Sequence, residues 1–110
     1  MSNKAFTTDL NDKPEYQRLL DAESQTHGMR SGRVFVEPGK SCGQHSTKDH
    51  EELLVFLTGQ AQVAIGEDQI LQAGQGKIAY IPPRTQHDVK NTGDGPLTYI
   101  YCVAPVNLEE

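Results

Sequence analysis

Apolar residues occur along most of this chain in short runs rather than at helical spacing. From residue 32 onward six runs follow one another: Val34–Val36, Leu53–Leu57, Ala61–Ile65, Ile70–Leu71, Ile78–Ile81 and Leu97–Ala104. Each run is bounded by Gly, Pro, Asn or Asp, the residues that favour turns. Short strands with turn residues between them are typical of an all-β sandwich or barrel.

The run Leu53–Leu57 is apolar on both faces of its predicted strand. Leu54 and Phe56 share a face with Glu52, and Leu53, Val55 and Leu57 take the other face. A sheet with one face in water would carry polar residues on that face. We therefore expect the outer face to be covered by a second copy of the chain, as a homodimer.

The first part of the chain, residues 1–31, predicts no single structure. Asp12 to Glu15 has the form of a helix start, with Asp at the cap and Glu three residues later. The segment is short and glycines soon interrupt it, so an added strand fits as well as a short helix. We expect this segment to pack on a barrel formed by residues 32–106, with residues 107–110 as a tail.

Composition and charge exclude several classes of protein. The 110 residues carry 10 Lys+Arg and 15 Asp+Glu, a net charge of −5, without a basic cluster, which argues against a nucleic-acid partner. The apolar run Leu53–Leu57 is far shorter than the ~20 residues of a membrane helix, and the first ten residues lack the apolar stretch of a secretory signal. Two cysteines without a close pair favour the reducing cytoplasm.

Two polar segments stand out against this background. In the first, five residues separate Gly39 from His45, and six separate Glu52 from Gly59. In the second, five residues separate Gly76 from Pro82, four separate Pro82 from His87, and three separate His87 from Asn91. Together the two segments resemble the two motifs of the cupin family, over about residues 32 to 104. The resemblance implies a small double-stranded β-helix, or jelly-roll barrel, commonly paired as a dimer.

The resemblance also implies a divalent metal held by His45, Glu52 and His87. Imidazole and carboxylate ligands suit Fe(II), and also Mn, Ni or Zn, and three ligands leave positions open for water and substrate. Thr47 stands where the family has a further His ligand, which predicts weaker metal binding. His50 shares the strand parity of Glu52 and is a possible substitute, although an exposed turn position suits it as well.

Further side chains are candidates for the lining of the pocket in this barrel. They are Thr47, Phe56, Tyr80, Tyr99, Tyr101 and Arg84. Arg84 replaces a Gly of the family's second motif, so the sequence does not predict the backbone conformation of this turn. Arg30 and Arg33 are long enough to reach a pocket from the Val34–Val36 strand, but we favour positions outside it.

The expected function is that of a small cupin that binds or acts on a small polar molecule, of sugar or carboxylate type, at a barrel metal. Similar cupins include oxygenases, isomerases and lyases, so the reaction and the catalytic residues stay open. The alternative is a non-catalytic module that binds a small ligand and has an incomplete or empty metal site. A third reading, a partner-binding dimer with an idle barrel, requires a barrel without a cavity.

Overall fold

Residues 4–108 of the computed structural model form nine β-strands and no helix. The strands are β1 (Gln17–Leu20), β2 (Arg30–Val36), β3 (His45–Ser46), β4 (His50–Thr58), β5 (Gln60–Ile65), β6 (Gln69–Gly74), β7 (Ile78–Ile81), β8 (Gln86–Asn91) and β9 (Leu97–Pro105). Within residues 4–108, no helix is long and apolar enough to cross a lipid bilayer. The prediction of an all-β fold is confirmed.

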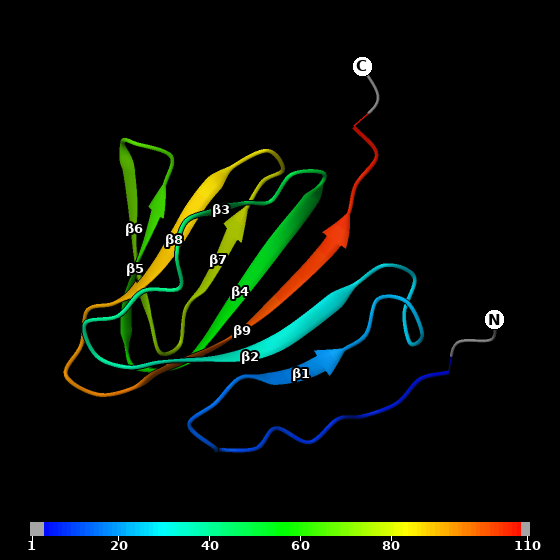
Figure 1. The fold of residues 1–110 in the computed structure, drawn as a ribbon, viewed down its shortest axis with the longest axis horizontal. Coiled ribbons are helices and arrows are strands. Elements are labelled where there is room, and N and C mark those ends of the chain that lie inside the picture. The colour runs from blue at the N-terminus through cyan, green and yellow to red at the C-terminus, as the bar shows by residue number, and fades with distance from the viewer. Residues whose placement is uncertain (1–3, 109–110) are drawn as a thin grey trace.

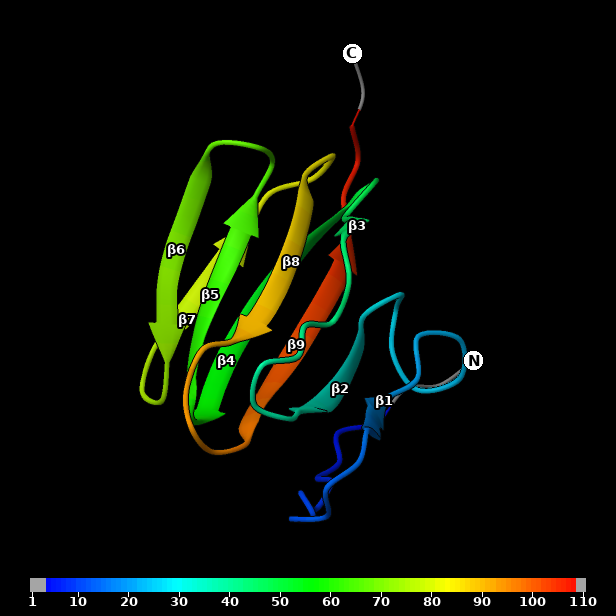
Figure 2. The same cartoon turned by 60° about the vertical axis from the view of Figure 1, so that its left-hand side comes forward.

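The strands build two sheets that face each other (Figure 1). One sheet has the order β1-β2-β9-β4-β7 and the other β3-β8-β5-β6. Every neighbouring pair is antiparallel. In the rotated view the four-stranded sheet lies in front of β4, β7 and β9 (Figure 2), so that side chains of both sheets meet in the space between them.

The side chains of β4 alternate between the space between the sheets and the outer face. Glu52, Leu54 and Phe56 are buried, whereas Leu53 on the opposite face is 38% exposed, as the sequence pattern predicts. The inner residues of both sheets form one core, which contains Val36, Leu54, Phe56, Ala61, Val63, Ala79, Ile81, Val89, Leu97 and Tyr99. Phe56 and Tyr99 pack with ring centroids 5.3 Å apart. The core fills one end of the barrel and leaves the other end for polar groups.

The N-terminal segment adds the edge strand β1 instead of a helix. Asp12 to Glu15 does not begin a helix: the chain bends at residues 14–15, where the Glu15 amide donates to the Lys13 carbonyl at 2.8 Å, and the guanidinium of Arg33 holds this stretch against the sheet. Its Nη2 donates to the Asn11 side chain and to the Lys13 carbonyl, each at 2.7 Å. Arg33 is thereby only 3% exposed. Figure 1 shows the segment running along the outer edge of the five-stranded sheet, beyond β1.

Arg84 lies in the loop between β7 and β8, where the cupin motif has Gly. Its φ of 57° falls in the left-handed region that glycine adopts at little cost. Its amide donates to the Lys48 carbonyl at 2.8 Å, which joins this loop to the loop before β4. The chain therefore keeps the glycine backbone conformation of the motif and carries an arginine in it.

Candidate metal centre

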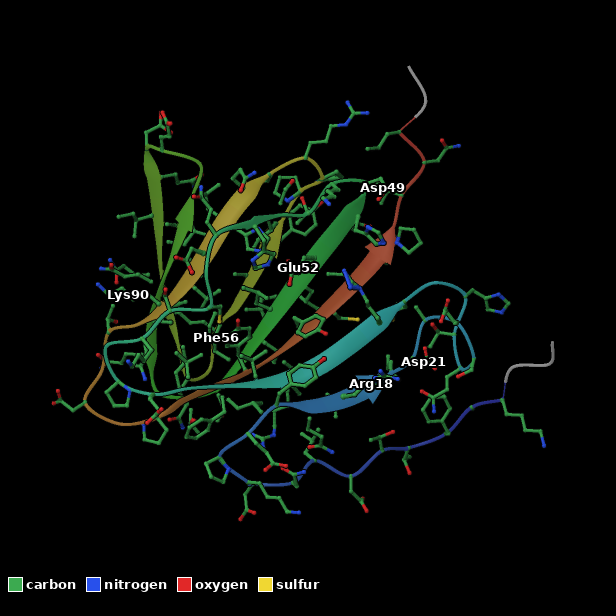
Figure 3. The ribbon with its side chains drawn as sticks, in the orientation of Figure 1. Arg18, Asp21, Asp49, Glu52, Phe56 and Lys90 are labelled. Carbon is green, nitrogen blue, oxygen red and sulfur yellow. The ribbon has the colours of Figure 1, made fainter. Side chains whose placement is uncertain are left out.

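Three side chains converge from three strands at the polar end of the barrel. His45 on β3 and His87 on β8 are paired residues of one sheet. Glu52 comes from β4 of the facing sheet and points into the space between the sheets (Figure 3). Their candidate ligand atoms all lie within 4.8 Å of one another. The resemblance to the cupin motifs predicts these three residues. Strand pairing brings the two histidines together, and the packing of the two sheets adds Glu52.

The three residues of the cluster differ in burial, and the side of His45 is accessible to solvent. His87 and Glu52 are 1% and 7% exposed, whereas His45 is exposed. The two imidazole rings meet edge to face, with centroids 4.1 Å apart. A small molecule therefore reaches the cluster from the side of His45, while His87 and Glu52 are held in place by the surrounding barrel.

Backbone carbonyls determine which nitrogen of each histidine is free. Nδ1 of His45 lies 3.1 Å from the Gly43 carbonyl, and Nδ1 of His87 lies 3.2 Å from the Thr85 carbonyl. A carbonyl only accepts, so each Nδ1 carries the proton and donates. In a neutral ring the lone pair is then on Nε2, which is the arrangement that metal-binding histidines use.

The contact between His87 and Glu52 fits a shared cation. Nε2 of His87 lies 3.0 Å from Oε1 of Glu52, yet this buried nitrogen makes no hydrogen bond of acceptable geometry with any described residue. Two ligand atoms that bind the same ion lie close together without a hydrogen bond between them, as these two atoms do. The buried, unsatisfied Nε2 therefore fits a divalent metal held with Glu52 and His45.

The electrostatics of the same pair favour a positive charge between them. Burial lowers the pKa of His87, but the Glu52 carboxylate and the Thr85 carbonyl raise it by more, so this pKa lies above its ordinary value. A raised pKa means that protons compete more strongly with a metal ion for Nε2 of His87 than they would at an ordinary imidazole.

Thr47 occupies the position of the missing ligand, and its hydroxyl is already used. Oγ1 donates to the Pro82 carbonyl at 2.7 Å and accepts from the Thr85 amide at 3.1 Å. The residue is 6% exposed. Thr47 thus joins β3 to the loop that precedes His87, and it helps to position that histidine instead of contributing a ligand.

His50 lies near the cluster but outside it. It is half-buried on β4 and lines the same cavity. Its Nδ1 lies 3.0 Å from a carboxylate oxygen of Asp49, and it does not belong to the group of converging ligand atoms. The structure therefore gives His50 a partner other than a metal.

A cavity of about 330 Å³ opens beside the three ligands. Of the six lining candidates, Thr47, Tyr99 and Tyr101 border it. Phe56 lies deeper in the core, and Tyr80 and Arg84 lie outside, exposed on the surface. Tyr80 is on the outer face of β7 and donates a hydrogen bond to Glu51 at 2.9 Å.

Two lining residues were missed or misplaced by sequence reasoning. Arg30 borders the cavity, so the prediction that it lies outside is wrong; the register of β2 against β9 turns it inward. Cys42 also borders the cavity, with Sγ 3.0 Å from the Tyr99 hydroxyl. Burial raises the pKa of the Cys42 thiol, which disfavours a reactive thiolate.

Known proteins resemble this chain over the segment that forms the barrel. The family model Cupin_2, described as a cupin domain, matches residues 32–103. The chain is 28% identical over 72 residues to an uncharacterized protein of Methanocaldococcus jannaschii, an alignment that covers 66% of this chain and 57% of the relative. This chain thus matches less than two thirds of that relative's length.

Solved structures share the architecture at lower identity. A protein of Thermotoga maritima described as a predicted oxalate decarboxylase has a TM-score of 0.76 at 21% identity, over 83% of this chain and 79% of that chain. An RmlC-like cupin family protein of Methanocaldococcus jannaschii, with a double-stranded β-helix fold, has a TM-score of 0.76 at 14% identity, over 93% and 91%. With the double-stranded β-helix and the family match established, the chain belongs to the cupin domain family.

Proposed function

We propose that this protein holds one divalent first-row metal ion, Fe, Mn, Ni or Zn, with Nε2 of His45, Nε2 of His87 and the Glu52 carboxylate. One observation carries the proposal: the buried Nε2 of His87 has no hydrogen-bond partner among the described residues and lies 3.0 Å from Glu52. Nitrogen and oxygen ligands of this kind suit those ions. Three protein ligands leave coordination positions open for water and a small molecule.

We propose that the metal-loaded site binds or acts on a small polar molecule of sugar or carboxylate type. When bound, the metal would supply a Lewis acid that polarises an oxygen of that molecule. The chain's own residues hold the ligands in place and surround the molecule with apolar walls, among them Val34, Leu54 and Val89. These walls exclude water from the reacting end. An oxygenase, isomerase or lyase reaction is compatible with this arrangement.

Size and lining support a small ligand. A volume of about 330 Å³ lies at the lower end of ligand pockets. A cavity of this size argues against an idle barrel. The relative described as a predicted oxalate decarboxylase provides one example of a small carboxylate for a barrel of this fold.

The alternative, a non-catalytic ligand-binding cupin with an incomplete metal site, is favoured by one observation. The Thr47 hydroxyl is committed to the Pro82 carbonyl and the Thr85 amide. The site therefore lacks a fourth protein ligand from this position, and metal affinity falls accordingly. On this reading the cavity binds its ligand with or without metal.

Metal analysis and ligand binding in chelator separate the two functions. Purified protein is dialysed against chelator, reloaded with Fe, Mn, Ni or Zn, and analysed for bound metal. About one equivalent bound is expected, and no uptake of any of the four ions would overturn the metal proposal. If a small ligand then raises the melting temperature equally in chelator and in metal, the non-catalytic alternative is the correct one.

We further propose that two copies pair through the outer face of the five-stranded sheet, in the cytoplasm. Leu53, Ile78 and Tyr80 are 38%, 69% and 56% exposed there, and Leu53 lies opposite Tyr80 in the register. Both cysteines are free thiols, as suits a reducing compartment. Light scattering should give twice the mass of 12.1 kDa, and an Ile78→Lys variant should be monomeric. A monomeric wild type would contradict the pairing.

A further inference from the structure

Arg30 stands in the same row of the sheet as the proposed metal ligand Glu52. Glu52 pairs with Val103 across β4 and β9, and Val103 pairs with Arg30 across β9 and β2. Residues paired in this way point to the same face of a sheet. All three line the cavity. Two strand spacings place the Arg30 backbone roughly 10 Å from that of Glu52. Arg30 is exposed to solvent and borders the cavity that the cluster of His45, Glu52 and His87 also lines.

Arg30 brings a positive charge to this space without a carboxylate to balance it. The ion pairs of Arg18 with Asp21, His50 with Asp49 and His87 with Glu52 do not include Arg30. The Glu52 carboxylate is directed to His87 rather than across the cavity. An arginine is permanently charged, so a neighbouring anion would stabilise it here.

The neighbouring row of the sheet places Tyr101 beside Arg30. Tyr101 lines the cavity next to Arg30, and its hydroxyl lies 2.6 Å from the Tyr16 hydroxyl. Tyr16 reaches this position over Gly32, where a Cβ would come within 2.4 Å of the Tyr16 oxygen. The absence of a side chain at Gly32 thus lets Tyr16 lie against Tyr101 on the side of the sheet next to Arg30, although Tyr16 itself does not line the cavity.

We propose that Arg30 binds the carboxylate of a small organic acid whose other end reaches His45, Glu52 and His87. The planar guanidinium matches a carboxylate with two parallel hydrogen bonds. A divalent ion held with a single carboxylate leaves the cluster positive, and Arg30 adds a further charge, so an anion is favoured over a neutral sugar. A sugar filling the cavity would cover Arg30 without balancing its charge. The inference rests on the proposed function, because it narrows the ligand of that same site.

The test measures binding rather than turnover. Malonate, succinate and glycolate are titrated calorimetrically into metal-loaded protein, and glycerol, ribose and sulfate serve as comparison probes. At least one of the three carboxylates should bind more tightly than all of the comparison probes. Arg30→Gln should weaken that carboxylate at least tenfold, and Arg30→Lys should recover only part of the loss, since lysine keeps the charge but not the planar fork.

A matched control removes the same charge from outside the cavity. Arg18 lies on β1, its side chain is 72% exposed, and it faces Asp21 (Figure 3). Arg18→Gln should leave carboxylate binding within about twofold of the wild type. All variants should bind metal within about threefold of the wild type, which also shows that they fold.

The outcomes separate this inference from the proposed function. If metal binds normally but no carboxylate binds, or if Arg30→Gln binds it as tightly as the wild type, the Arg30 assignment is overturned and the metal site stands. Equal or tighter binding of sulfate or ribose also overturns it. If no metal binds, the titrations are repeated in chelator, where a tenfold loss with Arg30→Gln still supports the carboxylate site and no loss overturns it.

Discussion

His45 and His87 are directly paired residues of two adjacent antiparallel strands, and the Nδ1 atom of each faces the carbonyl oxygen of the residue two positions before it. The same local contact thus presents the Nε2 atoms of both rings as ligands. Because the contact uses backbone oxygens, it persists whether or not a metal is present. The proposed metal site is therefore largely preorganised, which would reduce the entropic cost of binding a metal ion.

Removal of the buried imidazole should abolish tight metal binding. His87→Ala leaves two of the proposed ligands, so the affinity for Zn or Mn should fall by more than about 100-fold, beyond the roughly 10–100-fold expected of a residue that only supports a ligand. Competition with a fluorescent chelator measures the change. His27→Ala, at an exposed position, should have no effect, and His50→Ala should cost less than about threefold. Metal held equally well by His87→Ala would refute the ligand assignment.

Metal affinity should decrease as the pH is lowered. The pKa of His87 lies above its ordinary value, so at and below neutral pH a proton competes with the metal for Nε2. From about pH 8 to about pH 5.5 we expect at least a tenfold loss of affinity, larger than an imidazole of ordinary pKa near 6.5 would cause alone. Calorimetry in buffers of different ionisation enthalpy should detect proton release on binding. Affinity independent of pH would contradict this.

Thr47 should matter more for stability than for coordination. Thr47→Val keeps the shape but leaves the Pro82 carbonyl and the Thr85 amide without their partner, so the free energy of unfolding should fall by about 1–3 kcal/mol. Urea denaturation measures this change. Thr47→Ser preserves the hydroxyl and should lose less than half as much. If Thr47→Val were as stable as the wild type but lost its metal, the hydroxyl would be a ligand after all.

Arg84 should carry a backbone cost that glycine removes. Arg84→Gly and Arg84→Ala lose the same side-chain contacts, but only alanine retains the unfavourable left-handed conformation at φ 57°. The glycine variant should be the more stable of the two by about 1 kcal/mol. Thermal denaturation at matched protein concentration checks the difference. An alanine variant as stable as the glycine variant would indicate that the loop adopts a different backbone conformation.

Local patterns in the sequence were sufficient to predict the strands, and the resemblance to the cupin motifs was sufficient to single out His45, Glu52 and His87, whose side chains converge. Strand alternation places Glu52, Leu54 and Phe56 on one face because successive side chains point to opposite sides of any strand. The spacings around Gly39, His45, Glu52 and His87 depend on turn lengths, which are also local. These features do not require knowledge of which strands pair.

Tertiary structure alone decided what each inward position contacts. Arg30 faces the cavity because β2 pairs with β9 in a particular register, and Phe56 lies below the cavity because the facing sheet supplies its neighbours. Contacts between distant segments also give Thr47 its two backbone partners. They let Arg33 hold Asn11 and Lys13 against the sheet, where no helix forms. Sequence alone determined the all-β barrel and, through its resemblance to the cupin motifs, the candidate triad His45, Glu52 and His87, since periodicity and motif spacing are properties of the chain. Contacts between distant strands determined the cavity and the charged groups that line it.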